Sequence, residues 1–590
     1  MCGIVGYIGD KKTLPILIKG LKRLEYRGYD SAGIAYEKKN KIYLEKEVGR
    51  IQNLEKKLNL EEESYIGIGH TRWATHGKVT KTNSHPHQVN KVTLVHNGII
   101  ENYQELKKEL IEKGYHLKTE TDSEVACAYI DYTLRENKNL EIEKALNLAS
   151  HKLVGSYAFL IMIEGIENKL FALKKESPLV IGIGKGENFI ASDFSAYLDN
   201  TKEYIILEDN EVAIIEKNKV TLYKDGLEIP YQTKTLTEEV ELPNLENNEH
   251  YMLKEIKEQS SLIQKWNQLY LEENQPLPDI TKYQKIDIVA CGTAYHAGLI
   301  GKYLIEKNTD FEVSVYVASE YRYKKVLLNE NSLVIAISQS GETADTLACI
   351  KLAKKYNAKT LGIINVYNSS IARICDEVIY TKAGSEVSVA STKAYTSQVY
   401  ILSLLAQQFN QNKRNNNTYL ELPEKINQLI KINYQKIIKK IYKKKDIFFL
   451  GRNIDYITML EGSLKLKEIT YIHSEAFPAG ELKHGPISLI EKNTPVIALI
   501  TNKETALKTI SNIKEVKARG AFVILIIDKT IMNDIDKNIY DEIIYLQSTD
   551  FYTIPILSII PLQLIAYYTA KEKGLDIDKP RNLAKSVTVE

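Results

Sequence analysis

The feature that most constrains the fold is a pattern repeated in the second half of the chain. The segment Asp287–Gly292 (Asp-Ile-Val-Ala-Cys-Gly) aligns with Asp446–Gly451 (Asp-Ile-Phe-Phe-Leu-Gly), 159 residues further along. Asn331–Thr343 aligns with Asn493–Thr505 at an offset of 162 residues. Two alignments at nearly one offset indicate a duplicated domain. The alternative is that buried parallel strands resemble one another without duplication.

Within this half, buried runs alternate with helical stretches. The runs Ile286–Ala290, Leu333–Ile337 and Thr360–Asn365 are typical of fully buried strands, and their alternation with helices predicts a parallel, doubly wound sheet. We expect a polar connector around Gln407–Thr418 and a basic helix through Lys439–Lys445, which we interpret as a solvated face without a function.

The first 235 residues show a different pattern of short alternating strands and helices. We expect strands at Ser64–Gly69, Val92–His96, Tyr157–Ile163 and Val180–Gly184, and helices at Leu14–Leu24 and Ser123–Leu134. This predicts a sheet-and-helix domain that is not a simple βαβ series. An acidic stretch without Lys or Arg follows at 235–250 and is interpreted as a linker.

Composition limits the partners and the compartment. The 590 residues suit three or four domains, and a net charge of +2 provides no overall field that favours nucleic acid or an anionic membrane. Five cysteines without a CxxC pair suit a reduced cytoplasm. The amino terminus has no signal-peptide pattern, and no apolar run reaches the roughly 18 residues of a membrane span.

Cys2 is the first candidate catalytic residue. Methionine before a small residue is usually removed, so Cys2 can become the terminus and carry both a thiol and an α-amino group. The amine titrates near roughly 7.7–8.0 and the thiol near about 8.5, so the amine can take the thiol proton. Gly3 and Gly6 would let the backbone pack closely around this terminus. A chance cysteine beside the start codon is the alternative.

Neighbouring motifs supply groups that an amino-acid substrate needs. Arg72 could bind a carboxylate and Asp122 an ammonium group. Asn97 with the Gly98 N–H could form an oxyanion hole. Each has a structural alternative, since Asn97-Gly98 could be a hairpin turn and Asp122 a helix N-cap.

Together these motifs, with Glu25–Ser31, His70–Gly77 and Glu120–Glu124, resemble the class II glutamine amidotransferase domain over roughly residues 2 to 220. The resemblance implies an N-terminal-nucleophile fold with stacked sheets between helices (αββα). It implies Cys2 as nucleophile and Asn97 and Gly98 as oxyanion hole. The implied glutamine-binding residues are Arg72, Thr75, His76 and Asp122, with Arg27 supporting the site and Trp73 gating an ammonia tunnel.

Five histidines fall in this region: His70, His76, His85, His87 and His96. The pair His85 and His87 has no carboxylate or cysteine placed to complete a familiar ligand set. We therefore expect loop histidines and no metal site, and no cofactor is implied.

Ser338–Thr343 (Ser-Gln-Ser-Gly-Glu-Thr) follows one predicted strand and opens a helix. Backbone N–H groups and three hydroxyls there suit a phosphate, and the absence of a Walker lysine favours a monophosphate over ATP. Such residues also cap helices, but the position at the carboxyl end of a parallel strand favours a ligand site. The second copy has Thr501-Asn502-Lys503 instead, so only the first keeps this loop.

Cys291–Ala294 and Val389–Lys393 lie at other strand and helix ends of the first copy. With Ser338–Thr343 they resemble the sugar isomerase (SIS) domain, a flavodoxin-like parallel α/β fold that binds phosphosugars. The second copy resembles the same domain without the phosphate loop.

Acid–base candidates gather near the end of the chain. Lys465 and Glu468 are three residues apart on one predicted helical face, His484 lies in a Gly-bounded loop, and Lys585 lies in the tail 580–590. Moving a proton between C1 and C2 of a ketose requires a base, a ring-opening group and a means of polarising C2, for which a lysine imine suffices. A surface ion pair and an inert disordered tail are the alternatives.

The whole chain resembles the family of isomerising glutamine–fructose-6-phosphate aminotransferases, the glucosamine-6-phosphate synthases. The resemblance implies Glu468 as the enolisation base, His484 as the ring-opening residue reaching in from the other subunit of a homodimer, and Lys585 as the imine lysine. Glutamine and fructose 6-phosphate would be the substrates. The implied sugar-phosphate site consists of Thr293, Ser338, Gln339, Ser340, Thr343, Val389, Ser391 and Lys465. Ala294 departs from the family, which often has Ser there.

The expected organisation is a glutaminase domain at 2–235, a linker at 236–250, SIS domains at 275–416 and 440–575, and an active-site tail at 576–590. Three rivals remain. A phosphoribosyl amidotransferase should show a pyrophosphate loop with paired acids, and we find none. A non-catalytic sugar-phosphate sensor would lack the Cys2 constellation. An enzyme that processes fructosamine 6-phosphate would need no glutaminase half.

Overall fold

The computed structural model describes residues 2–74, 76–236, 244–307, 309–410 and 416–588, apart from the side chains of 532–534. These residues form two compact units, one of 1–242 with 586–590 and one of 243–585. Thr75 and most of the predicted linker, residues 237–243, lie outside the described residues.

The first unit contains two sheets of antiparallel strand pairs. The eight-stranded sheet runs β15 (Lys234–Thr235), β11 (Glu203–Ile206), β9 (Val180–Ile183), β10 (Glu187–Ala191), β1 (Gly3–Gly9), β4 (Ile66–Arg72), β2 (Ser31–Lys38), β3 (Lys41–Val48). The seven-stranded sheet runs β14 (Leu227–Ile229), β13 (Val220–Lys224), β12 (Glu211–Ile215), β8 (Leu170–Lys175), β7 (Gly155–Ile163), β6 (Val92–Ile100), β5 (His87–Val89).

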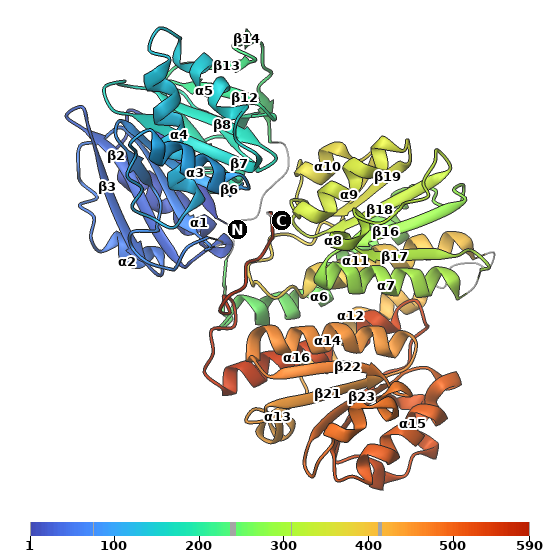
Figure 1. The fold of residues 1–590 in the computed structure, drawn as a ribbon. Coiled ribbons are helices and arrows are strands. Elements are labelled where there is room, and N and C mark those ends of the chain that lie inside the picture. Colours follow the sequence, from blue (N-terminus) through green and yellow to red (C-terminus); the bar gives the residue numbers. More distant parts are fainter. Residues whose placement is uncertain (1, 75, 237–243, 308, 411–415, 589–590) are drawn as a thin grey trace. The chain divides into compact units, whose positions relative to one another are not determined.

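Helices cover the outer face of each sheet, which gives the predicted αββα layers (Figure 1). Helix α1 packs on β1 and β4, while α4 packs on β6 and α5 on β12. The helices are α1 (Thr13–Leu24), α2 (Ile51–Glu55), α3 (Tyr103–Glu112), α4 (Asp122–Glu136) and α5 (Ile142–Ser150). Gly6 allows the two sheets to meet, because a Cβ on this residue would lie 2.3 Å from Leu160 Cδ2 of the facing sheet.

The second unit contains two five-stranded parallel sheets with the same strand order. The first runs β17 (Val313–Val317), β16 (Lys285–Ala290), β18 (Ser332–Ser338), β19 (Lys359–Ile364), β20 (Glu377–Tyr380). The second runs β22 (His473–Pro478), β21 (Asp446–Gly451), β23 (Pro495–Ile500), β24 (Phe522–Asp528), β25 (Glu542–Leu546). In both, the earliest strand lies second in the sheet, as in flavodoxin-like folds, so the predicted duplication is confirmed.

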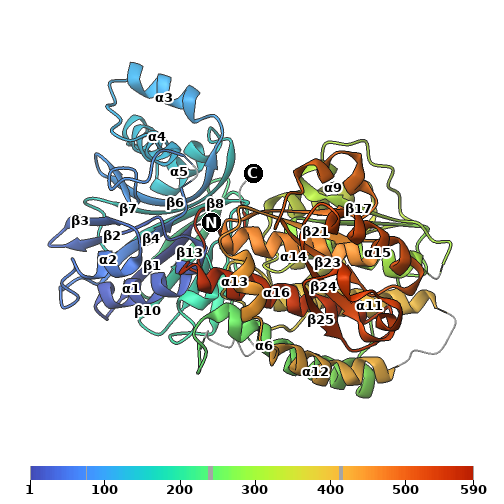
Figure 2. The same cartoon turned by 90° about the horizontal axis from the view of Figure 1, so that it is seen from below.

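Helices pack around both sheets and join the two copies into one core (Figure 1). They are α6 (Tyr251–Asn267), α7 (Gly292–Glu306), α8 (Ala318–Tyr321), α9 (Ala344–Lys355), α10 (Ser370–Ile374), α11 (Lys393–Ala406), α12 (Asn416–Ile430), α13 (Gln435–Ile441), α14 (Ile454–Thr470), α15 (Lys503–Lys517) and α16 (Ile554–Glu572). Figure 2 shows α6 and α12 side by side. Among the described helices, α16 alone is long and apolar enough to span a membrane, but 89% of its apolar window is buried, as in the core helix of a globular protein.

Two predicted segments differ from the structure. Residues 416–418, expected in a connector, already belong to α12, whose buried Tyr419 and Leu422 pack into the core. The basic helix expected through Lys445 ends at Ile441. The buried face of α13 consists of Ile437, Ile438 and Ile441, and the lysines that follow continue no apolar face.

Candidate active sites

The first site lies where β1 begins and β4 ends. Gly3 pairs with Thr71, so Cys2 lies beside the end of β4 and the residue that follows it, Trp73. The Trp73 N–H donates to Cys2 Sγ over 3.3 Å. Burial raises the pKa of the Cys2 thiol above its usual value, while the positive amino terminus, the Trp73 N–H and Arg72 act in the opposite direction. The thiol therefore needs a nearby base to become a nucleophile.

Asn97 and Gly98 approach Cys2 from β6 of the other sheet. Asn97 Nδ2 donates to the Cys2 carbonyl oxygen over 3.1 Å. Gly98 has a φ of +133°, a conformation that suits glycine. Both lie within β6 rather than in a hairpin turn. Their position beside Cys2 fits two donors for an anionic tetrahedral intermediate.

A small cleft, whose empty space of about 260 Å³ includes open solvent, is lined by the nucleophile and by three of the four predicted glutamine-binding residues. Its lining includes Cys2, Arg72, His76, Gly98 and Asp122. The Arg72 guanidinium is buried and donates to the carbonyl groups of the loop that follows, including that of His76. Asp122 is also buried at the start of α4 and accepts the Ile100 N–H over 2.9 Å. The cleft is thus lined by a cation, Arg72, and an anion, Asp122, as well as by the Cys2 thiol.

Two residues outside the substrate groups hold the surrounding loops. Arg27 is buried and forms an ion pair of 2.5 Å with Asp193. Asp30 accepts the Ala74 N–H over 2.8 Å and so fixes the start of the loop after Trp73. The resemblance implied a supporting role for Arg27, whereas no role for Asp30 or Asp193 was predicted, because a single acidic residue in a loop carries no recognisable spacing.

Four of the five histidines form a buried cluster at the cleft, and His70, His87 and His96 lie in strands rather than in the loops we expected. The rings of His70 and His85 stack with centroids 4.0 Å apart, and His87 lies edge-on to His85 at 4.7 Å. Burial lowers the pKa of His70 to about 3 and also lowers the pKa values of His85, His87 and His96. They are therefore neutral packed rings. No group of His, Cys, Asp or Glu among the described residues is arranged to hold a metal ion.

The second site begins at the phosphate loop, which connects β18 to α9. The Ser338 and Thr343 hydroxyls lie 3.1 Å apart, and Ser338 Oγ accepts the Gly341 N–H over 3.0 Å. Gln339, Ser340 and Thr343 are half-buried. These contacts shape the turn before any anion arrives.

The second copy supplies charged groups to this site from α14. Lys465 Nζ donates to Thr293 Oγ1 of the first copy over 2.9 Å and forms an ion pair of 2.6 Å with Glu468. The side chain of Lys465 is only 1% exposed, so the pair is not a surface ion pair. Glu461, which is fully buried, accepts from Thr293 over 3.0 Å and lies 2.7 Å from His296 Nδ1. Neither Glu461 nor His296 was predicted.

The electrostatics suit a carboxylate that exchanges a proton. Burial raises the pKa of Glu468 above its usual value, and Glu461 acts in the same direction, whereas Lys465 and Lys585 oppose the shift. Burial also favours the neutral form of Lys465, but Glu461 and Glu468 hold its pKa above the usual value. A carboxyl group with a raised pKa beside a charged lysine is a candidate for proton abstraction.

The tail lysine is anchored in this half of the chain rather than disordered. Lys585 Nζ forms an ion pair with Glu386 and donates to Ser388 O over 2.8 Å and to Ser391 Oγ over 3.0 Å. The second oxygen of Glu386 accepts the N–H groups of Thr392 and Ala394 at the start of α11. Although burial opposes it, Lys585 lowers the pKa of Glu386.

Three further predicted residues complete the description. Val389 donates its N–H to Asp578 O over 2.9 Å, which ties the sugar loop to the tail. His484 is exposed, and no described hydrogen bond or ion pair joins it to the sugar-site residues. Ala294, where the family often has Ser, packs against the hydrophobic core.

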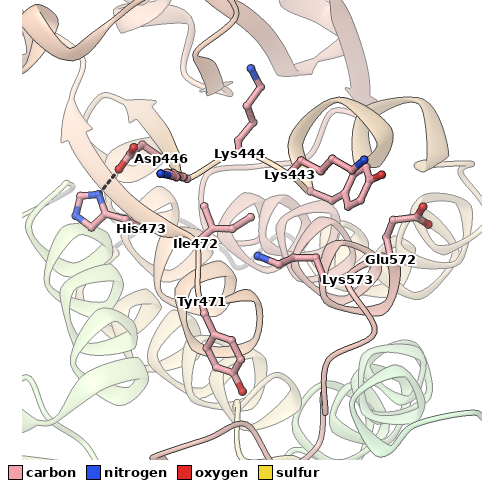
Figure 3. Close-up of a pocket in the computed structure, with 10 residues that line it drawn as sticks. Lys443, Lys444, Asp446, Tyr471, Ile472, His473, Glu572 and Lys573 are labelled. Carbon is pink, nitrogen blue, oxygen red and sulfur yellow. Dashed lines mark hydrogen bonds and ion pairs between the residues drawn. The ribbon is translucent and has the colours of Figure 1, made fainter.

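Figure 3 shows a further hollow, which lies on the second copy of the duplicated domain. Lys443, Lys444, Lys445 and His473 are among the residues that line it, and none of the predicted site residues is. His473 pairs with Asp446 at 3.0 Å, and Lys444 points away from the other labelled side chains (Figure 3). The charged side chains around this hollow therefore do not point toward one shared position.

Both halves of the chain match known protein families. Residues 70–199 match the family described as "Glutamine amidotransferase domain", and residues 279–408 and 440–572 each match "SIS domain". Over the full length of both chains, this chain is 47% identical to "Glutamine--fructose-6-phosphate aminotransferase [isomerizing]" of Caldanaerobacter subterraneus and 45% identical to the protein of the same name from Pyrococcus horikoshii. The chain belongs to the glutamine–fructose-6-phosphate aminotransferase family. The resemblance stated from the sequence is confirmed.

A solved structure supports the same assignment for the SIS half of this aminotransferase. The C-terminal domain of the glucosamine–fructose-6-phosphate aminotransferase from Francisella tularensis is 38% identical and superposes with a TM-score of 0.52. The match covers 57% of this chain and all of that one. The predicted fold class, a glutaminase domain followed by two parallel α/β SIS domains, is therefore confirmed.

Proposed function

We propose that this aminotransferase converts fructose 6-phosphate and glutamine into glucosamine 6-phosphate and glutamate, the first step of amino-sugar biosynthesis. The observation that carries the proposal is that one chain contains both sites. The first is a cleft lined by Cys2, Gly98 and Asp122, with Asn97 bonded to Cys2, and the second is a phosphate loop at Ser338–Thr343. Each half supplies one of the two reactions that such a synthesis needs.

In the glutaminase half, removal of Met1 frees the α-amino group of Cys2, which takes the thiol proton. The thiolate attacks the amide carbon of glutamine, and Asn97 and Gly98 donate to the oxygen that becomes negative. Arg72, Thr75, His76 and Asp122 hold the amino-acid end of the substrate. As the intermediate collapses, the proton held by the Cys2 amine passes to the leaving nitrogen, the C–N bond breaks and ammonia is released. The thioester that remains is hydrolysed by water to glutamate and the free Cys2 thiol.

In the SIS half, Ser338, Gln339, Ser340, Thr343 and their neighbours bind the phosphate, with Thr293, Val389, Ser391 and Lys465 completing the site. His484 of a partner subunit opens the sugar ring, and Lys585 forms an imine at C2 as the ketone oxygen leaves as water. Ammonia displaces the lysine, and Glu468 then moves a proton from C1 to C2, which converts the ketose derivative into the amino aldose.

The organisation proposed for this chemistry has four parts besides the linker at 236–250. They are the glutaminase domain at 2–235, SIS domains at 275–416 and 440–575, and the tail at 576–590. Ammonia passes inside the protein, with Trp73 as gate, so that it stays unprotonated. The protein works as a cytoplasmic homodimer, and five free cysteines fit that compartment.

An isotope experiment tests the proposal. Glutamine labelled with ¹⁵N in its amide is supplied with fructose 6-phosphate and excess unlabelled ammonium, and the product is analysed by mass spectrometry. We expect glucosamine 6-phosphate that retains most of the label. A phosphorylated product that contains no nitrogen from glutamine would contradict the proposal. Turnover of fructosamine 6-phosphate or of phosphoribosyl pyrophosphate in place of fructose 6-phosphate would also contradict it.

A further inference from the structure

The orientation of the Asn97 amide determines whether this side chain can donate to an oxyanion. Among the described residues, the amide has two hydrogen-bond partners: Nδ2 donates to Cys2 O over 3.1 Å, and Oδ1 lies 3.1 Å from His70 Nε2. We propose that His70 is a positioning residue for glutamine hydrolysis, which fixes the Asn97 amide by donating to its oxygen. This inference rests on the oxyanion role proposed for Asn97.

The direction of these bonds follows from the atoms involved. The carbonyl oxygen of Cys2 can only accept, so the Asn97 atom beside it is the NH₂ group. The amide oxygen therefore faces His70. His70 Nε2 also lies 2.9 Å from the carbonyl oxygen of His96. Because both partners of Nε2 are acceptors, this nitrogen carries the proton.

The surroundings keep His70 in this single state. Its side chain is fully buried, and burial lowers its pKa to about 3, although the hydrogen bonds to the His96 carbonyl and to Asn97 act in the opposite direction. Its other nitrogen, Nδ1, has no hydrogen-bond partner among the described residues. The ring of His85 stacks on it at 4.0 Å and is itself fixed, because its Nδ1 accepts the His96 N–H over 3.3 Å. The donor on Nε2 is therefore present throughout the neutral pH range.

The bond also connects the two sheets that carry the catalytic groups. His70 lies on β4 and pairs with Ile4 of β1, two residues after the nucleophile. Asn97 lies on β6 of the other sheet. His70 thus links the position of the Cys2 strand to the orientation of the oxyanion donor. Loss of this link should slow the chemical step more than it weakens glutamine binding.

A double-mutant cycle tests the role. His70→Phe keeps a ring that can stack on His85 but removes the donor. We expect the kcat of glutamine hydrolysis to fall about 10- to 100-fold and the KM for glutamine to stay within about threefold. In an Asn97→Ala background, the same change should cost less than about threefold, because the group that His70 orients is already gone.

His87→Phe is the matched control. His87 belongs to the same buried cluster, but its described side-chain hydrogen bond goes to Thr121 Oγ1 at 3.3 Å and not to Asn97. We expect this variant to keep kcat within about threefold and its effect to multiply with that of Asn97→Ala. If His70→Phe does not fold, His70→Gln and His70→Met replace it. They are similar in size, and only Gln keeps a donor, so Gln should be at least about tenfold faster than Met.

Two results would overturn the inference. The first is that His70→Phe retains kcat within threefold, or that Gln and Met are equally active. The second is that the losses of His70→Phe and Asn97→Ala multiply in the double variant. A different failure belongs to the proposed function: if Asn97→Ala alone hydrolyses glutamine at the full rate, Asn97 is not an oxyanion donor, and the role of His70 is lost with it.

Discussion

Replacement of Gly98 by alanine is the sharpest structural perturbation of the glutaminase site. A Cβ on Gly98 would lie 2.0 Å from Ser156 O and 2.8 Å from Tyr157 Cα. Both are backbone atoms of β7, whose Tyr157 pairs with Gly98, so no side-chain rotation can relieve the overlap. The φ of +133° adds strain of about 1–3 kcal/mol for a residue with a side chain. The strand must therefore move, and the Gly98 N–H moves with it.

The magnitude follows from the loss of one aligned donor. Removal of a single oxyanion donor typically lowers kcat about 10²- to 10³-fold. We expect Gly98→Ala to lower glutamine hydrolysis by about 100-fold or more, measured as glutamate release. Isomerisation of fructose 6-phosphate to glucose 6-phosphate, measured without glutamine, should stay within about twofold, because it uses the SIS half.

Gly114→Ala separates strain from overlap. Gly114 also has a positive φ, +84°, but no atom lies within 4 Å of the added Cβ. This variant should lose about 1 kcal/mol of unfolding free energy and keep glutaminase activity within about twofold. The reasoning is refuted if Gly98→Ala keeps glutaminase activity within threefold of the wild type, or if Gly114→Ala damages it equally.

Three further predictions concern the SIS half. Burial raises the pKa of Asp455 from 3.8 to about 7, so the folded state binds the extra proton between these values and the unfolding free energy falls as pH rises through that window. Asp455→Asn should therefore gain stability over the wild type at pH 8 and not at pH 4, by up to about 4 kcal/mol in denaturant titrations. Glu468→Gln should slow sugar isomerisation about 10²- to 10⁴-fold. Because burial raises the pKa of Glu468, the acid limb of the wild-type kcat/KM profile should lie above pH 4.5. An acid limb below that pH would contradict the assignment of Glu468 as the base. Lys585→Arg should abolish synthesis and keep the melting temperature of the wild type. Lys585→Met should abolish synthesis and also lower the melting temperature, because Glu386 would be left buried without its cation. Equal melting temperatures for the two variants would argue against the ion pair.

The architecture of the SIS half could be predicted because buried parallel strands produce continuous apolar runs at regular spacing. Ile286–Ala290 and Leu333–Ile337 both lie within observed strands, and the duplication appears as two sheets of one order. The helix through Lys445 was wrong because lysines have high helix propensity but cannot extend an apolar face. Propensity alone was outweighed by the end of that face at Ile441.

Candidate site residues could be grouped from the sequence where they lie close together in the chain, and less so where single residues converge from distant elements. The motif that contains Arg72 and Trp73 and the pair Asn97-Gly98 line one cleft or contact Cys2. Glu461 was missed although a signal existed, since its spacing to Lys465 and Glu468 places three charges on one face of a largely apolar helix. For Glu386 no local pattern precedes the contact with Lys585, 199 residues further along.

In the proposed synthesis the Cys2 sulfur, and no other group, releases the nitrogen that the SIS half consumes. Cys2→Ala tests it most directly when glutamine-dependent glucosamine 6-phosphate formation and glutamine-free isomerisation of fructose 6-phosphate are measured on the same preparation. We expect the first activity to be lost and the second to persist at the wild-type rate. Amino-sugar formation from glutamine at an undiminished rate in this variant would contradict the role of Cys2.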